Sequence, residues 1–198
     1  MKTFTGIYSF LAGWEPRTGI VRLLLCATLV ILVPSCGDSP RACFDRAVLN
    51  CNMIHDFAGK GMEQQLQAPS VKLTDAKTGA FAPMTRKEVV DDKIAFVEQS
   101  LAKVRQLGQT DDNREMLQAS IALHEYVLPV YRDDYERLAK LYDGGAPKAA
   151  IAQLSSSIAT KYGPQFRVLS DRLTAAGKVY AARHQIQVVW DVQTAPSQ

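Results

Sequence analysis

Three histidines are the side chains of this sequence best suited to metal binding: His55, His124 and His184. Metal sites inside helical bundles often pair a histidine with a glutamate three residues earlier on the same helix. The residues at those positions are Asn52, Ile121 and Ala181, and none of them is a glutamate. His124 and His184 instead fall on apolar helical stripes or their extension. We therefore expect structural histidines and no metal site.

The serine, lysine and glycine residues give no pattern of nucleophilic catalysis or phosphate binding. No Gly-x-Ser-x-Gly segment occurs, and the serines at 155–157 fall within a predicted helix. Gly59-Lys60-Gly61 lacks the surrounding residues of a phosphate-binding loop. The sequence therefore predicts a protein that is not an enzyme, with no catalytic residue and no cofactor.

Five tyrosines recur on the predicted helical stripes: Tyr131, Tyr135, Tyr142, Tyr162 and Tyr180. Their rings could line an aromatic groove for a ligand. Alternatively, they could pack in or beside the core, with the hydroxyl groups reaching water. We favour core packing.

The first 36 residues carry an export pattern. Residues 23–33 are eleven uncharged, mostly apolar residues that follow Arg22 and end at Pro34. A helix that crosses a bilayer needs about 20 apolar residues, so this run suits a secretory signal better. After it comes Val33-Pro34-Ser35-Cys36: an aliphatic residue, a spacer, a small residue and a cysteine. This segment resembles the lipobox of bacterial lipoproteins.

The resemblance implies a lipid anchor on Cys36. The signal peptide, residues 1–35, would be removed, a diacylglyceryl group would join the Cys36 sulfur, and the new amine would be acylated. Two or more acyl chains hold a protein stably on a membrane. Gly37 is not the Asp that retains lipoproteins at the inner membrane in enteric-type sorting, so the resemblance favours the periplasmic side of the outer membrane. The alternative is an uncleaved signal anchor. Because the segment before Arg22 is long, we expect translation to start near Val21.

Cys43 and Cys51 would be the two free thiols after lipidation. In an oxidising periplasm paired cysteines are usually bonded. Eight residues of helix separate two Cα atoms by about 12 Å, whereas a disulfide permits about 7 Å. A bond and a continuous helix over 43–51 therefore exclude each other, and we lean towards the bond.

Composition and charge indicate a globular protein without a nucleic-acid partner. The chain has 198 residues, of which 47% are hydrophobic and 22% charged. Residues 1–35 hold three Lys and Arg and one Glu, so the remaining 163 residues have a net charge of +1. A nearly neutral body without a dense basic patch argues against nucleic-acid binding.

Apolar stripes predict three long helices. Thr85 and Glu88 form a capping box before the first, over residues 86–107, and Gly108 ends it. Its stripe is Val90, Ile94, Val97, Leu101 and Val104. The second begins near Asp111 or Asp112, and its stripe is Leu117, Ile121, His124, Leu128, Tyr131, Tyr135, Leu138 and Tyr142. The third follows Pro147, with the stripe Ile151, Leu154, Ile158, Tyr162, Phe166, Leu169, Leu173, Ala176 and Tyr180.

Prolines and weaker patterns complete the expected fold. Pro129 and Pro164 should kink the second and third helices. A shorter helix should begin at Ser39-Pro40. Residues 59–84 read as a long connection with a small hairpin, and residues 186–198 as a tail with strand periodicity or a fraying helix end.

The sequence thus predicts an all-α domain over residues 40–185, an antiparallel bundle of three long helices, two of them proline-kinked, plus a shorter N-terminal helix. Residues 36–39 would be its lipidated tether. We expect a non-enzymatic interaction, scaffold or immunity-type module with a protein partner, held on the membrane by the acyl chains on Cys36. The alternative is a carrier that binds a small apolar ligand between its helices.

Overall fold

The computed structural model describes residues 38–190. The expected signal peptide at 1–35, the start near Val21, the lipidated Cys36 and the tail residues 191–198 lie outside the described residues. Within the described range no helix combines the length and apolar character needed to cross a bilayer.

The described chain is mostly helical, which confirms that part of the prediction. Two short helical segments come first, α2 (Pro40–Ala47) and the 3-10 helix η1 (Leu49–Ile54), and α3 (Lys60–Gln67) follows. The longer elements are α4 (Arg86–Arg105), α5 (Arg114–Val130), the π-helix η2 (Tyr131–Tyr135), α6 (Glu136–Asp143) and α7 (Lys148–Arg183). Between α3 and α4 the chain forms two strands, β1 (Val71–Asp75) and β2 (Ala80–Pro83).

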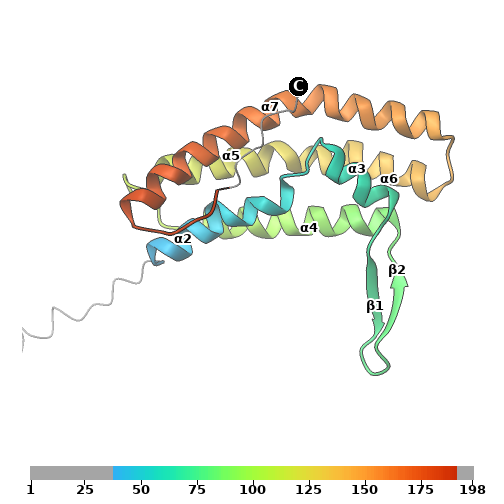
Figure 1. The fold of residues 1–198 in the computed structure, drawn as a ribbon, viewed down its shortest axis with the longest axis horizontal. Coiled ribbons are helices and arrows are strands. Elements are labelled where there is room, and N and C mark those ends of the chain that lie inside the picture. The colour runs from blue at the N-terminus through green and yellow to red at the C-terminus, as the bar shows by residue number, and fades with distance from the viewer. Residues whose placement is uncertain (1–37, 191–198) are drawn as a thin grey trace, which may run out of the picture. The chain divides into compact units, whose positions relative to one another are not determined.

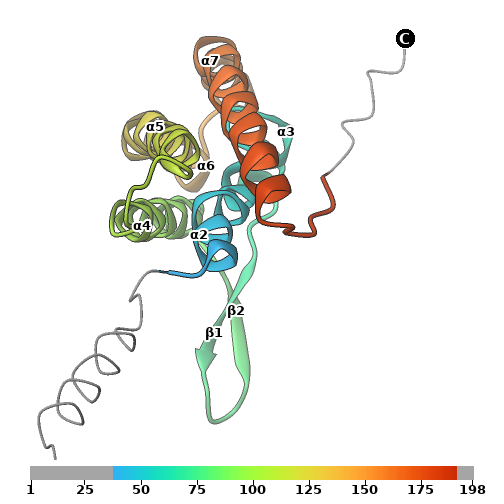
Figure 2. The same ribbon diagram turned by 90° about the vertical axis from the view of Figure 1, so that its left-hand side faces the viewer.

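The helices pack around one apolar core. Helices α4, α5 and α7 lie side by side, and α5 contacts both of the others (Figures 1 and 2). Helix α2 packs against all three, and its Phe44 and Ala47 are completely buried. Most predicted stripe residues are buried or partly buried in this core. The buried face of α5 is nevertheless wider than its predicted stripe, because it also includes Met116, Leu123 and Val127.

Local signals in the sequence set the ends of several helices. The Ser39 side chain accepts a hydrogen bond from the Ala42 N–H, with Pro40 at the first helical position of α2. The expected capping box of Thr85 and Glu88 begins α4. After α6, Gly145 adopts a left-handed conformation with φ 66°, which glycine adopts without strain, and α7 starts after Pro147.

The segment predicted as the second helix is divided in the structure. Pro129 lies inside α5, one residue before its end, and the π-helical turn η2 and then α6 follow without a break in helical structure. A proline has no N–H for the helical ladder, and π-turns are one way in which a helix absorbs an interrupted ladder. Pro164, in contrast, lies inside the uninterrupted 36-residue α7.

The strands β1 and β2 form an antiparallel hairpin, as the sequence predicted for this connection. Val71 pairs with Pro83 and Leu73 with Phe81, and the register shifts between Leu73 and Asp75. Side chains that face each other across a pair lie on the same face of the hairpin. These four apolar residues therefore share one face, and all four are exposed. The hairpin projects away from the helices (Figure 1).

The C-terminal segment, for which the sequence allowed strand periodicity or a fraying helix end, is neither a strand nor a helix over residues 186–190. Residues 186–190 have no regular secondary structure, and no strand pairs with them among the described residues. Ile186, Val188 and Trp190 nevertheless pack against the core, whereas Val189 is 95% exposed. The alternation thus reflects a segment with one face on the helices. Gly177 of α7 makes room for it, since a Cβ there would lie 3.4 Å from Trp190 and 3.1 Å from Val48.

Candidate functional site

Cys51, Ser120 and His124 form the cluster that most resembles a reactive centre. The Cys51 Sγ lies 3.9 Å from the Ser120 Oγ and 3.9 Å from the His124 Nε2. The His124 Nδ1–H donates to the Ser120 carbonyl at 2.8 Å. The nearest acceptor for the thiol proton is the Ala47 carbonyl, at 3.5 Å. The Cys51 thiol thus has the Ala47 carbonyl, the Ser120 hydroxyl and the His124 Nε2 as hydrogen-bond partners.

Burial keeps this cluster neutral. Desolvation raises the pKa of Cys51 to about 12, with a smaller opposing effect from Ser120. Burial also lowers the pKa of His124, although its bond to Ser120 opposes the shift. A nucleophilic cysteine needs a lowered pKa and access to solvent. At neutral pH these groups are therefore an uncharged thiol and an uncharged imidazole in the core.

The expected disulfide between Cys43 and Cys51 is not formed in the structure. Both cysteines are free and buried. Cys43 lies in α2 and Cys51 in η1, two successive helical segments that meet at Val48. The Cys43 sulfur accepts a hydrogen bond from the Asn113 side chain at 3.8 Å, and burial raises the pKa of Cys43.

The other two histidines lie apart from this cluster. His184, at the end of α7, contacts the Asp112 carboxylate, which also accepts a bond from Arg183 at 3.1 Å. His55 is exposed and pairs with Asp56. Among residues 38–190 no group of three or more His, Cys, Asp or Glu side chains is placed to hold a metal ion.

The tyrosines pack mainly as core residues. Tyr131, Tyr135 and Tyr180 are buried, and the Phe57 ring contacts both Tyr131 and Tyr135 edge-on. Tyr142 and Tyr162 are partly buried. The Tyr135 hydroxyl accepts a hydrogen bond from the Ala58 N–H at 2.9 Å, and burial raises the pKa of Tyr135 to about 12. These rings hold the turn before α3 in place.

A groove between α3 and α7 has a volume of about 340 Å³. Helix α3 contributes Lys60 and Glu63, and Tyr135 of η2 and Leu138 of α6 line the groove as well. The side of α7 that faces the groove carries small side chains only: Ala152, Ser155, Ser156 and Ala159. Small side chains leave the backbone of α7 accessible at close range.

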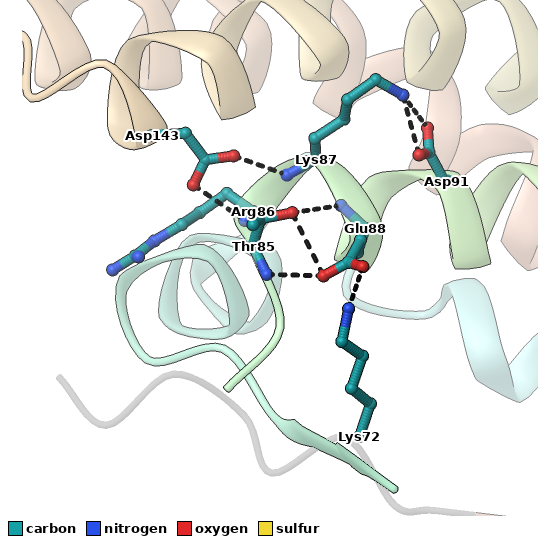
Figure 3. Close-up of polar contacts among 7 residues, drawn as sticks. All are labelled: Lys72, Thr85, Arg86, Lys87, Glu88, Asp91 and Asp143. Atoms are coloured by element: carbon teal, nitrogen blue, oxygen red, sulfur yellow. Dashed lines mark hydrogen bonds and ion pairs between the residues drawn. The ribbon is translucent and has the colours of Figure 1, made fainter. Parts of the chain in front are cut away.

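Polar contacts at the start of α4 fix the base of the hairpin (Figure 3). Lys72 of β1 forms an ion pair with Glu88, the residue that closes the capping box with Thr85. Asp143, at the end of α6, accepts hydrogen bonds from the Arg86 and Lys87 N–H groups at 2.9 and 3.0 Å. The hairpin, α4 and α6 are thereby joined at one point.

The sequence did not predict the groove or the Asp143 contact. The small residues of α7 are spaced like any exposed helical face, and only the approach of α3 makes them one wall of a cavity. Ala58, which begins this approach, has a positive φ of 53° that its residue type does not indicate. The bond from Asp143 to α4 spans 57 residues, so no local pattern reveals it.

Comparison with known proteins gives no match of any kind: no family model, no curated protein and no solved structure matches this chain.

Proposed function

We propose that the protein is a lipid-anchored, non-enzymatic interaction module on the periplasmic side of a bacterial envelope, with the outer membrane favoured. Acyl chains on Cys36 would hold it on the membrane, and the helical body would bind a protein partner. The finer arrangement, an antiparallel bundle of three long helices bent at Pro129 and Pro164, belongs to the same proposal.

The observation that carries the interaction function is the groove between α3 and α7. Its small α7 residues would let a partner segment approach the helix backbone closely. Lys60 and Glu63 offer one charge of each sign beside it, which suits the polar rim that surrounds the centre of most interfaces. The reactive groups of the core, by contrast, are buried and neutral.

A carrier for a small apolar ligand is the second candidate, and it would use the same groove. A volume of about 340 Å³ lies within the range of small-molecule pockets. Apolar-ligand sites are lined mainly by apolar and aromatic side chains, whereas this groove includes Lys60, Glu63 and two serines. The mixed lining favours a protein segment.

Cross-linking in intact cells tests the proposal. A photoreactive amino acid at Ser156, inside the groove, should give a defined protein adduct. The matched control is Ser157, the exposed neighbour that does not line the groove, and it should give no such adduct. A lipid bound to the purified protein, lost in Ser156→Arg but kept in Ser157→Arg, would favour the carrier. Equal adducts from both positions would overturn the groove as the binding site.

The anchor has its own test. Replacing Cys36 with serine should abolish the incorporation of labelled fatty acid and leave the precursor uncleaved. Labelling that persists in Cys36→Ser would show that Cys36 is not the lipid attachment site.

A further inference from the structure

The exposed apolar face of the β1–β2 hairpin has no role in the proposed interaction groove. Val71, Leu73 and Phe81 are 60%, 52% and 65% exposed, and Pro83 beside them is exposed as well. An isolated two-stranded hairpin is marginally stable in water. This one turns its Lys72 and Ala82 face towards α4 and leaves its apolar face uncovered.

The hairpin projects on the same side of the helical body as the point where the chain enters it. In both views α2 and α4 lie on the lower side and α7 lies at the top, and the hairpin extends below α4 (Figures 1 and 2). The described chain begins just before α2, at Asp38. The hairpin therefore extends on the side of the helical body to which a lipid tether would be attached.

The lengths of the tether and the hairpin decide what the hairpin meets. From Cys36 to the Ser39 cap there are three residue steps, which span at most about 10 Å. The five residues of β1 extend about 17 Å at roughly 3.3 Å per residue. A body held by so short a tether cannot keep a longer projection on the same side clear of the lipid surface unless it tilts away.

We propose that the apolar face of the hairpin rests in the lipid surface that holds Cys36, as a second attachment point that orients the body. This inference depends on the proposed lipid anchor. The side chains of Val71, Leu73 and Phe81 would enter the boundary between headgroups and acyl chains. Penetration stays shallow, because the unpaired outer edges of a two-stranded hairpin need water or headgroups as hydrogen-bond partners.

The charges of the hairpin fit an anionic lipid surface. Lys72 is engaged by Glu88 of α4, but Lys77 lies in the turn between the strands, and a long lysine side chain can reach headgroup phosphates while its stem lies on apolar surface. Because α3 and α7 lie on the other side of α4 from the hairpin, this orientation turns the groove towards the periplasm (Figure 1). The anchor and the hairpin together would present the groove to a partner on the periplasmic side.

A thiol-accessibility experiment tests the inference on the full chain. Phe81→Cys and Val168→Cys each place one thiol at positions that are similarly exposed in the fold, 65% and 60%. Position 168 belongs to α7, the helix that lies farthest from the hairpin in Figure 1. The acylated proteins are inserted into the outer leaflet of vesicles of phosphatidylethanolamine and phosphatidylglycerol, at less than one protein per vesicle. The rates of reaction with a membrane-impermeant maleimide are then compared between the two variants, without denaturant, so that Cys43 and Cys51 stay buried.

The expected result is that Phe81→Cys reacts at least tenfold more slowly than Val168→Cys. Equal rates in these vesicles would overturn the inference, and so would protection that appears only at high protein density, since a second copy would then cover the hairpin. Protection in native membranes but not in the pure lipid would assign the hairpin to a protein partner instead. Circular dichroism checks that both variants are folded.

The mass of the purified protein separates this inference from the anchor on which it depends. A chain without acyl groups overturns the anchor, and the hairpin inference with it. An acylated chain with an unprotected thiol at position 81 overturns the hairpin inference alone.

Discussion

Asp143 should contribute to stability well beyond what its exposed position suggests. The first backbone N–H groups of a helix have no partner within the helix. In α4 the Thr85 N–H donates to Glu88 and the Glu88 N–H donates to Thr85, as in other capping boxes. The two N–H groups between them, those of Arg86 and Lys87, both donate to the Asp143 carboxylate (Figure 3).

The size of the effect follows from two opposing contributions. Replacing a residue that caps a helix start with alanine costs about 0.5–2 kcal/mol. Asp143 also ends α6, where a negative charge opposes the helix dipole, and relief of that repulsion offsets a few tenths of a kcal/mol. We therefore expect Asp143→Ala to reduce the free energy of unfolding by about 1 kcal/mol, and Asp143→Asn by roughly half as much because one acceptor remains.

Urea unfolding followed by circular dichroism measures this difference. With a slope of about 2 kcal/mol per molar urea, the midpoint for Asp143→Ala should fall by roughly 0.5 M. The matched control is Asp91→Ala, which removes an exposed carboxylate that pairs with Lys87 on the same helix. Its midpoint should shift by less than a third as much, since exposed pairs contribute little. Equal shifts for the two variants would refute the capping argument.

Three further predictions concern the core. Leu123→Ala, at a side chain that is 2% exposed, should cost about 2–5 kcal/mol in urea unfolding, whereas Leu169→Ala, at a partly exposed position, should cost less than half of that; equal losses would contradict the burial of α5. Because burial lowers the pKa of His124, the unfolded chain binds a proton that the folded chain does not, so stability should fall as pH decreases below about 6.5, and His124→Gln should show a shallower pH dependence of the unfolding midpoint. Cys43 and Cys51 should resist a thiol-specific disulfide reagent at pH 8 until urea is added, and an unfolded chain without titratable thiols in the absence of reductant would show that they are bonded.

Local and periodic features of the fold could be predicted from the sequence. The cap at Ser39 and the capping box at Thr85 use side chains within three residues of the groups that they bind, so the residue types alone predict them. The stripe over Val90 to Val104 is buried or partly buried, because one face of α4 meets the core along its length. The hairpin at 71–83 followed from two short apolar runs separated by turn residues.

Features that depend on contacts between distant elements could not be predicted from the sequence. Periodicity placed His124 on a buried face, but the proximity of Ser120 and Cys51 depends on how η1 packs against α5. The alternation at the C-terminal end allowed a strand or a fraying helix end, because an extended segment that packs one face on helices gives the same pattern as a strand. The expected compartment favours a disulfide, whereas Cys43 and Cys51 are both free in the structure, one in α2 and the other in η1.

The irregularities of the hairpin also bear on how molecules of this protein would behave when crowded. An exposed strand edge is a template on which strands of other copies can stack, and aggregation can grow from it. Pro83 withholds one N–H from the outer edge of β2, and the register shift after Leu73 interrupts the regular spacing of β1. The proposed lipid anchor would confine the protein to the membrane plane, where neighbouring copies would meet far more often than in free diffusion. These two interruptions would keep an apolar, protruding ribbon from polymerising under such crowding.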